Sequence, residues 1–193
     1  MRTQIKSESD AAYLLRNQYG HLIRYIPEWE KWIVFDGKIW TRDDALRVDG
    51  LIRELLDGHH GIDARWKGSL NVVRNVKGFA VRDTALHVSA TEIDADPLLL
   101  GIKSGVHSLR RHRPISARRN IYVVKRTSVD PDFARVPKRW IAFVEEICRG
   151  DQAKVRYLQR WFGYCLSGSV EERTLLIIYG PGGWSALEKL VQF

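Results

Sequence analysis

The sequence predicts an α+β fold that is mostly helical, with two small β-hairpins, a C-terminal helix pair and an unpaired strand that leads into an incomplete phosphate loop. Three observations support this. Apolar residues recur at helical spacing in several segments. Two turn signals, Asp36-Gly37 and Ser104-Gly105, interrupt runs rich in β-branched, aromatic and leucine residues. A short apolar run near the C-terminus, 174–179, is closed by glycines, which is typical of a buried strand that enters a loop.

The N-terminal two thirds of the chain contain the expected hairpins. A first helix, 10–20, has Asp10 as its expected N-cap and Gly20 as its stop. The aromatic residues around the first hairpin, among them Trp29 and Trp40, are interpreted as the core of a small sheet, and a base-stacking platform is the alternative. The remaining expected elements are the hairpin 31–41, helices at 43–56, 65–76 and 82–88, the hairpin 98–109 and a strand at 120–124.

Two amphipathic helices are predicted after a linker at 131–137. The first spans 138–148, and the second runs from its N-cap Asp151 to about residue 166. Cys148 and Cys165 lie in these helices without a Cys-x-x-Cys spacing, so we expect buried free thiols in a reducing compartment.

The glycine cluster Gly180, Pro181, Gly182 and Gly183 resembles the start of a phosphate-binding loop. The complete signature, G-x-x-x-x-G-K-[ST], places a lysine at the sixth position after the first glycine and a hydroxyl at the seventh. Those positions hold Ala186 and Leu187. We therefore expect a vestigial nucleotide loop, no cofactor bound by this chain and no catalytic residues. An ordinary glycine-rich turn is the alternative.

The charge of the chain is concentrated in one segment. The net charge is +8, with a pI near 9.7, which favours an anionic partner. No acidic residue occurs between Asp96 and Asp130. We call 103–126 the basic segment, and its candidate binding residues are Lys103, Arg110, Arg111, Arg113, Arg118, Arg119, Lys125 and Arg126. Such a run is either a DNA-binding surface or a solvated face.

Several functional classes are not expected. No apolar run approaches the ~20 residues that span a bilayer, and the N-terminus has no apolar signal core, so a cytoplasmic protein with no membrane partner is predicted. The adjacent His59 and His60 lack further ligands at metal-binding spacing. No Ser/His/Asp or Cys/His set is suggested by spacing.

The order of the elements resembles that in phage and plasmid primase–helicases, a family also found in large DNA viruses. The resemblance rests on the helix pair before the Gly-Pro-Gly-Gly loop, on Asp94-Ala-Asp-Pro97 with the residues that follow, and on the first hairpin. It implies a DNA-replication function, ATP and Mg²⁺ as cofactors of the parent family, and hexamers of the full-length proteins. It also implies three parts: a mixed module over 1–130, a helix pair over 131–173, and a remnant strand and incomplete Walker A loop over 174–193.

Two functional hypotheses follow. The first is a truncated primase–helicase whose remaining chain is inactive as an ATPase. The second is a stand-alone module that binds DNA or a replication partner through the basic segment. In either case DNA is the expected partner, and the unpaired strand can promote self-association of the chain.

Overall fold

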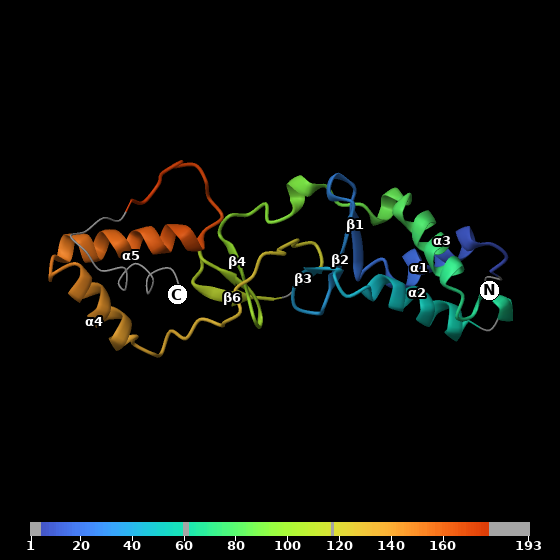
Figure 1. The fold of residues 1–193 in the computed structure, drawn as a ribbon, viewed down its shortest axis with the longest axis horizontal. Helices are drawn as coiled ribbons and strands as arrows, with labels where there is room; N and C mark the ends of the chain where they lie inside the picture. Colours follow the sequence, from blue (N-terminus) through green and yellow to red (C-terminus); the bar gives the residue numbers. More distant parts are fainter. Residues whose placement is uncertain (1–4, 60–61, 117, 178–193) are drawn as a thin grey trace. The chain divides into compact units, whose positions relative to one another are not determined.

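A computed structural model of the chain describes residues 5–59, 62–116 and 118–177. The chain divides into two compact units, 1–130 and 131–193 (Figure 1). The glycines of the expected phosphate loop, Gly180 to Gly183, lie outside the described residues.

Three helices of the first unit pack against one another. Their bounds are α1 Glu8–Tyr19, α2 Arg47–Gly58 and α3 Leu70–Val81. A capping box starts α1: Ser7 is its N-cap, and Asp10 lies in the first turn rather than at the cap position that the sequence suggested. The N-cap position of α2 is Leu46, and the carboxylate of the preceding Asp43 accepts hydrogen bonds from the N–H groups of Arg47, at 2.6 Å, and Val48, at 3.0 Å, so it satisfies two donors of the first turn.

The first sheet is antiparallel, with the order β1-β2-β3. Its strands are β1 Ile23–Ile26, β2 Lys31–Phe35 and β3 Trp40–Arg42. The Asp36-Gly37 turn joins β2 to β3 as predicted, and Phe35 lies opposite Trp40 in the register. Strand β1 makes the expected hairpin a three-stranded sheet.

The second sheet is also antiparallel and has the order β4-β5-β6. Its strands are β4 Leu99–Ile102, β5 Gly105–Ser108 and β6 Arg113–Ile115. The Ser104-Gly105 signal correctly predicted the turn between β4 and β5. Strand β6 was not predicted, because Pro114 at its centre removes a backbone donor and three residues are too few for a periodicity.

Short 3₁₀ helices connect these elements: Pro27–Trp29, Ala64–Trp66, Thr84–Leu86 and Ala90–Glu92. Two of them replace expected α-helical segments. The helix expected at 65–76 starts later, at Leu70, where Ser69 supplies the cap, and the helix expected at 82–88 is the single turn Thr84–Leu86.

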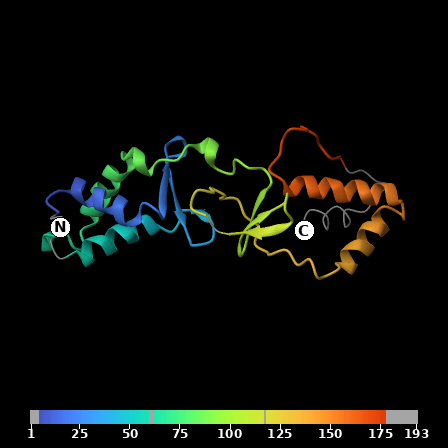
Figure 2. The ribbon, with the colours of Figure 1, turned by 180° about the vertical axis from the view of Figure 1, so that it is seen from behind.

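The core of the first unit continues from the helices through the first sheet to the second. One cluster joins residues of α1, α2 and α3 to β1 and β2, and a second surrounds Trp40 on the first sheet. A third contains Ile39, at the β2–β3 turn, with Val106 of β5 and Val123. Ile39 is 2% exposed and Trp40 fully buried, so the turn region of the first hairpin is packed against the second sheet. Figures 1 and 2 show the unit from opposite sides.

The second unit contains the predicted helix pair, α4 Lys138–Ile147 and α5 Gln152–Leu166. Asp151 caps α5, as expected, by accepting hydrogen bonds from the N–H groups of Ala153 and Lys154. The ring of Trp140 on α4 lies 5.7 Å from that of Phe162 on α5, so the helices pack through aromatic side chains. Cys148 is buried as expected, but Cys165 is exposed, which corrects the prediction for that thiol.

Two predicted strands are absent from the described residues. The segment 120–124 is irregular, although Val123 is buried, because its backbone is held by a side chain rather than by a ladder. Residues 174–177, the described part of the predicted terminal strand, are also irregular, with Leu175 81% and Ile177 72% exposed.

Within the described residues, no helix combines the length and the apolar composition needed to cross a membrane. The same residues hold no cluster of three or more His, Cys, Asp or Glu side chains suited to a metal ion.

Candidate nucleic-acid interface

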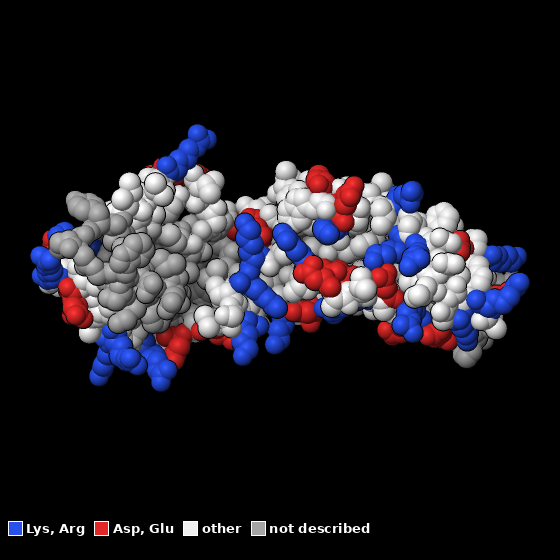
Figure 3. Space-filling model, in the orientation of Figure 1, with Lys and Arg blue, Asp and Glu red and all other residues white. Residues whose placement is uncertain are grey.

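The eight cations of the basic segment are all exposed and lie on or beside the second sheet. Lys103 occupies the β4–β5 turn, and Arg110 and Arg111 occupy the turn between β5 and β6. Figure 3 shows Lys and Arg side chains over this part of the first unit, with acidic side chains among them. The remaining five are Arg113 on β6, Arg118 and Arg119 in the following connection, and Lys125 and Arg126 beside β4.

The second sheet separates two groups of these cations. Because β4 and β5 are antiparallel, the turn with Lys103 and the turn with Arg110 and Arg111 lie at opposite ends of β5. Four residues of strand span about 13 Å at ~3.3 Å per residue. Successive phosphates on one strand of a duplex are about 3.4 Å apart along the helix axis. The two turns are farther apart than that, so they can contact different phosphates.

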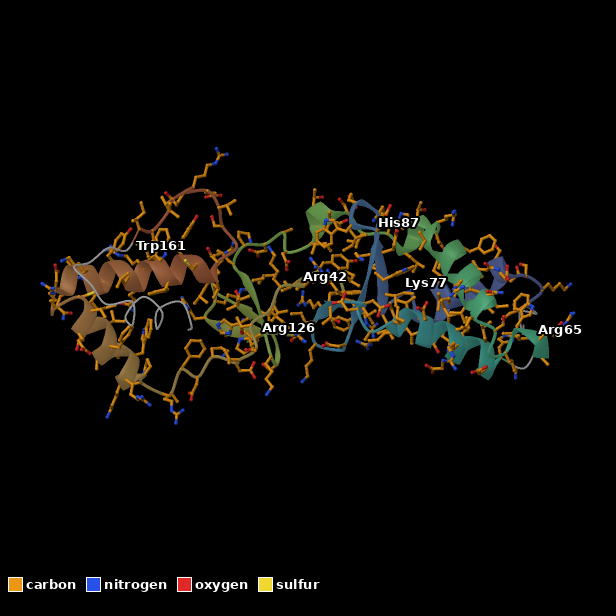
Figure 4. The ribbon with its side chains drawn as sticks, viewed as in Figure 1. Arg42, Arg65, Lys77, His87, Arg126 and Trp161 are labelled. Atoms are coloured by element: carbon orange, nitrogen blue, oxygen red, sulfur yellow. The ribbon has the colours of Figure 1, made fainter. Side chains whose placement is uncertain are left out.

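The structure brings Lys103 and Arg126 together, although 23 positions separate them in the sequence. They line one hollow with Thr127 and Ser128, and its volume is about 340 Å³. Figure 4 shows Arg126 beside the strands of the second sheet. We call this space the 103/126 hollow.

A close backbone approach places Arg126 there. The N–H of Thr127 donates a hydrogen bond to the carbonyl oxygen of Gly101, at 2.9 Å, and Gly101 forms an isolated bridge with Arg126. A Cβ atom at Gly101 would collide with the carbonyl oxygen of Lys125, and it would lie 2.8 Å from the Cδ1 atom of Ile39. Glycine at this position is therefore required for the segment to lie against β4.

Asp94 holds the backbone of the same segment. Its Oδ1 atom accepts hydrogen bonds from the N–H groups of Val124, at 2.8 Å, and Lys125, at 3.3 Å. Its own N–H donates to the carbonyl oxygen of Tyr122, at 2.8 Å. Asp94 thus fixes the path of the chain immediately before Arg126.

One further cation of this surface, Lys38 in the β2–β3 turn, was not predicted from the sequence. The pKa of the Asp130 carboxyl is lowered, first by hydrogen bonds from Ser104 and then by the positive charges of Lys103 and Lys38. Lys38 therefore lies close enough to act on the same carboxylate as Lys103. No local pattern could have indicated this, since only the packing of Ile39 on the second sheet brings position 38 near position 103.

Two carboxylates also lie at this surface. Asp36 Oδ2 is 3.7 Å from the Nη1 atom of Arg126. Its Oδ1 atom accepts hydrogen bonds from the N–H groups of Lys38 and Ile39, and Asp130 accepts one from the N–H of Ser104, at 2.7 Å. Both carboxylates are engaged by the backbone of the turns that carry the cations.

The first sheet does not form an open aromatic platform. Trp32 is 6% exposed and Trp40 is fully buried, so core packing is the role of these rings. Trp29 is 38% exposed, with the guanidinium of Arg42 5.7 Å from the centre of its ring.

Most of the chain matches a known protein family. The family described as "D5 N terminal like" matches residues 12–149, more than half of the chain. The chain belongs to this family. Its members form the N-terminal module of phage and plasmid primase–helicase proteins, which confirms the resemblance inferred from the sequence. No curated protein matches the chain. The D5 N-terminal match covers the whole of the basic segment and helix α4.

Proposed function

We propose that this D5 N-terminal-like chain contributes DNA binding to a replication protein of the primase–helicase type, and that the basic segment is its contact surface. The observation that carries the proposal is the exposure of all eight cations on one small sheet and its connections, in a stretch with no acidic residue. Phosphate contacts by Lys and Arg release counterions, so the affinity should fall steeply with salt.

The alternative for such a surface is a solvated face without a ligand. Two features favour a binding surface. The backbone that carries Lys125 and Arg126 is fixed by Asp94 and by the approach to Gly101. The family belongs to proteins that act in DNA replication.

Fluorescence anisotropy with a labelled oligonucleotide, single-stranded or duplex, tests the proposal across a salt series. The quadruple variant R110A/R111A/R118A/R119A should bind far more weakly and with a smaller salt slope, because each lost phosphate contact lowers the slope by about 0.7 for a single strand or 0.9 for a duplex. The matched control, R47A/R53A/R65A/R74A, removes the same charge from exposed positions on or beside α2 and α3. The proposal fails if wild type does not bind at low salt, or if both variants lose affinity equally.

We also propose that the 193-residue chain has no ATPase activity of its own. The support is chemical: Ala186 and Leu187 stand where a phosphate loop places its lysine and its Mg²⁺-binding hydroxyl. Phosphate release by the purified chain should equal that of a blank without enzyme, and turnover above the blank would refute the proposal.

A further inference from the structure

The strongest unexplained feature of the first unit is the 103/126 hollow. We propose that it binds one phosphate group of a DNA strand, and this inference rests on the DNA binding proposed above. The hollow would then be the fixed point of the interface, where a single phosphate is held by two cations from separate segments.

The hollow is formed by the β4–β5 turn and the segment 126–128, whose positions are tied together. The N–H of Lys103 donates to the carbonyl oxygen of Val129, at 3.5 Å, and the adjacent Ser104 N–H donates to Asp130 Oδ1. On the other side, Thr127 is hydrogen-bonded to Gly101. Strand β4 and its turn to β5 are thus connected to the segment 126–130 by three hydrogen bonds. A site on a backbone held in this way loses less conformational freedom when a ligand binds than a site on a flexible loop does.

The side chains provide chemistry suited to a phosphate. Arg126 has five N–H donors, its side chain is 47% exposed, and its Nη1 atom lies 3.7 Å from Asp36 Oδ2. The planar guanidinium can donate two parallel hydrogen bonds to phosphate oxygens, while Lys103 supplies a compact charge. Ser128, at the same hollow, adds a hydroxyl donor.

The charges remain positive when the neighbouring carboxylates are counted. Three cations, Lys38, Lys103 and Arg126, face the two carboxylates of Asp36 and Asp130. Because both carboxylates also accept backbone hydrogen bonds, part of their negative charge is directed into the turns. A bound anion therefore complements the net charge.

The test compares the double variant K103A/R126A with the matched control K67A/R74A, which removes one Lys and one Arg charge from exposed positions near and on α3. The probe is a labelled oligothymidylate, with anisotropy recorded over a salt series. We expect K103A/R126A to bind several-fold more weakly, with a salt slope smaller by about 0.7, the contribution of one phosphate on a single strand. The control should retain the wild-type slope.

A second measurement assigns the effect to the hollow. The full chain is titrated with the same oligothymidylate, unlabelled, and followed by NMR. The amide signals of 103, 104 and 126–128 should shift. These shifts should be lost in K103Q/R126Q, which removes both charges but keeps longer side chains than the alanine variant. Inorganic phosphate serves as the comparison ligand, because the shared chemistry is the phosphate group.

The outcomes separate the two proposals. If wild type binds DNA and K103A/R126A retains the full salt slope, the hollow is not a phosphate site, and the proposed function stands. If wild type does not bind DNA at low salt, the proposed function fails. Shifts at the hollow with inorganic phosphate alone would then overturn the assignment to a DNA strand.

Discussion

The indole N–H of Trp40 donates a hydrogen bond to the carbonyl oxygen of Arg119, and the two atoms are 3.2 Å apart. Trp40 is fully buried and contacts the rings of Phe35 and Tyr122, whose centres lie 5.4 and 5.3 Å from its own. Arg119 is an exposed member of the basic segment. One core residue of the first sheet therefore holds the backbone of a candidate DNA-binding residue that lies 79 positions away.

Replacing Trp40 should destabilise the first unit through two separable effects. Trp40→Phe keeps an aromatic ring but removes the indole N–H that donates to the Arg119 carbonyl, together with a small part of the packed volume, which costs about 1–3 kcal/mol. Trp40→Ala removes nearly the whole buried side chain and should cost about 3–5 kcal/mol. Urea titrations followed by far-UV circular dichroism measure both losses.

Trp29→Phe is the control for these variants, because Trp29 is 38% exposed in the same unit. A surface replacement of this kind usually changes stability by less than ~0.5 kcal/mol. Equal effects of W29F and W40F would show that the bond to Arg119 contributes nothing measurable.

Asp94 gives a second test, because it combines a left-handed backbone conformation with a side chain that accepts two backbone hydrogen bonds. Its backbone has a positive φ of 51°, which Asn tolerates better than Ala. Its Oδ1 atom accepts the two N–H groups that precede Arg126, and an Asn carbonyl oxygen can do the same.

Asp94→Ala should therefore lower the free energy of unfolding by about 1–3 kcal/mol, whereas Asp94→Asn should stay close to wild type. The DNA affinity of the folded variants should follow the same order, since the segment that carries Lys125 and Arg126 loses its support only in D94A. If D94N is as unstable as D94A, the carboxylate charge rather than the acceptor geometry determines this site.

The fold was predictable where one local signal determines the structure. The Asp36-Gly37 turn and the Asp151 cap are such signals, and the structure has a hairpin and a helix start at these positions. The segment 120–124 shows the limit of this reasoning. Its β-branched residues favour a strand, but Asp94 and the packing of Val123 hold it in an irregular path. Tertiary contacts here override the intrinsic preference.

The candidate interface was predictable in composition but not in arrangement. The eight cations were identified because they all fall within one stretch that has no acidic residue. The structure pairs Lys103 with Arg126 and brings Lys38 close to them through the packing of two hairpins. No periodic pattern in the sequence indicates such packing.

The two cysteines should react at different rates, because burial separates them. Cys148 is 6% exposed, and burial raises the pKa of its thiol, while Cys165 is exposed. Since the thiolate is the reactive form, a thiol reagent such as DTNB should label Cys165 rapidly and Cys148 slowly in the native chain. The variant C165S should lose the rapid phase and C148S should keep it. The reverse pattern would contradict the packing of α4.

The start of α5 should depend on pH through its cap. Hydrogen bonds from the N–H groups of Lys154 and Ala153 lower the pKa of the Asp151 carboxyl below its ordinary 3.8. A group whose pKa is lower in the folded than in the unfolded state stabilises the fold above its unfolded value, and this contribution is lost as the pH falls through the folded value. The cap should therefore be intact at pH 6 and weaken only below about pH 4.

The variant Asp151→Asn isolates this effect, because an Asn cap accepts the same hydrogen bonds without a titrating charge. Thermal melts at pH 6 and pH 3 should show wild type more stable than D151N at the higher pH, with a smaller difference at the lower pH. The other carboxylates titrate equally in both proteins and cancel in the comparison. In wild type, the amide signals of Ala153 and Lys154 should shift with an apparent pKa below 3.8. A difference between the two proteins that does not change with pH would mean that the Asp151 charge plays no part in starting α5.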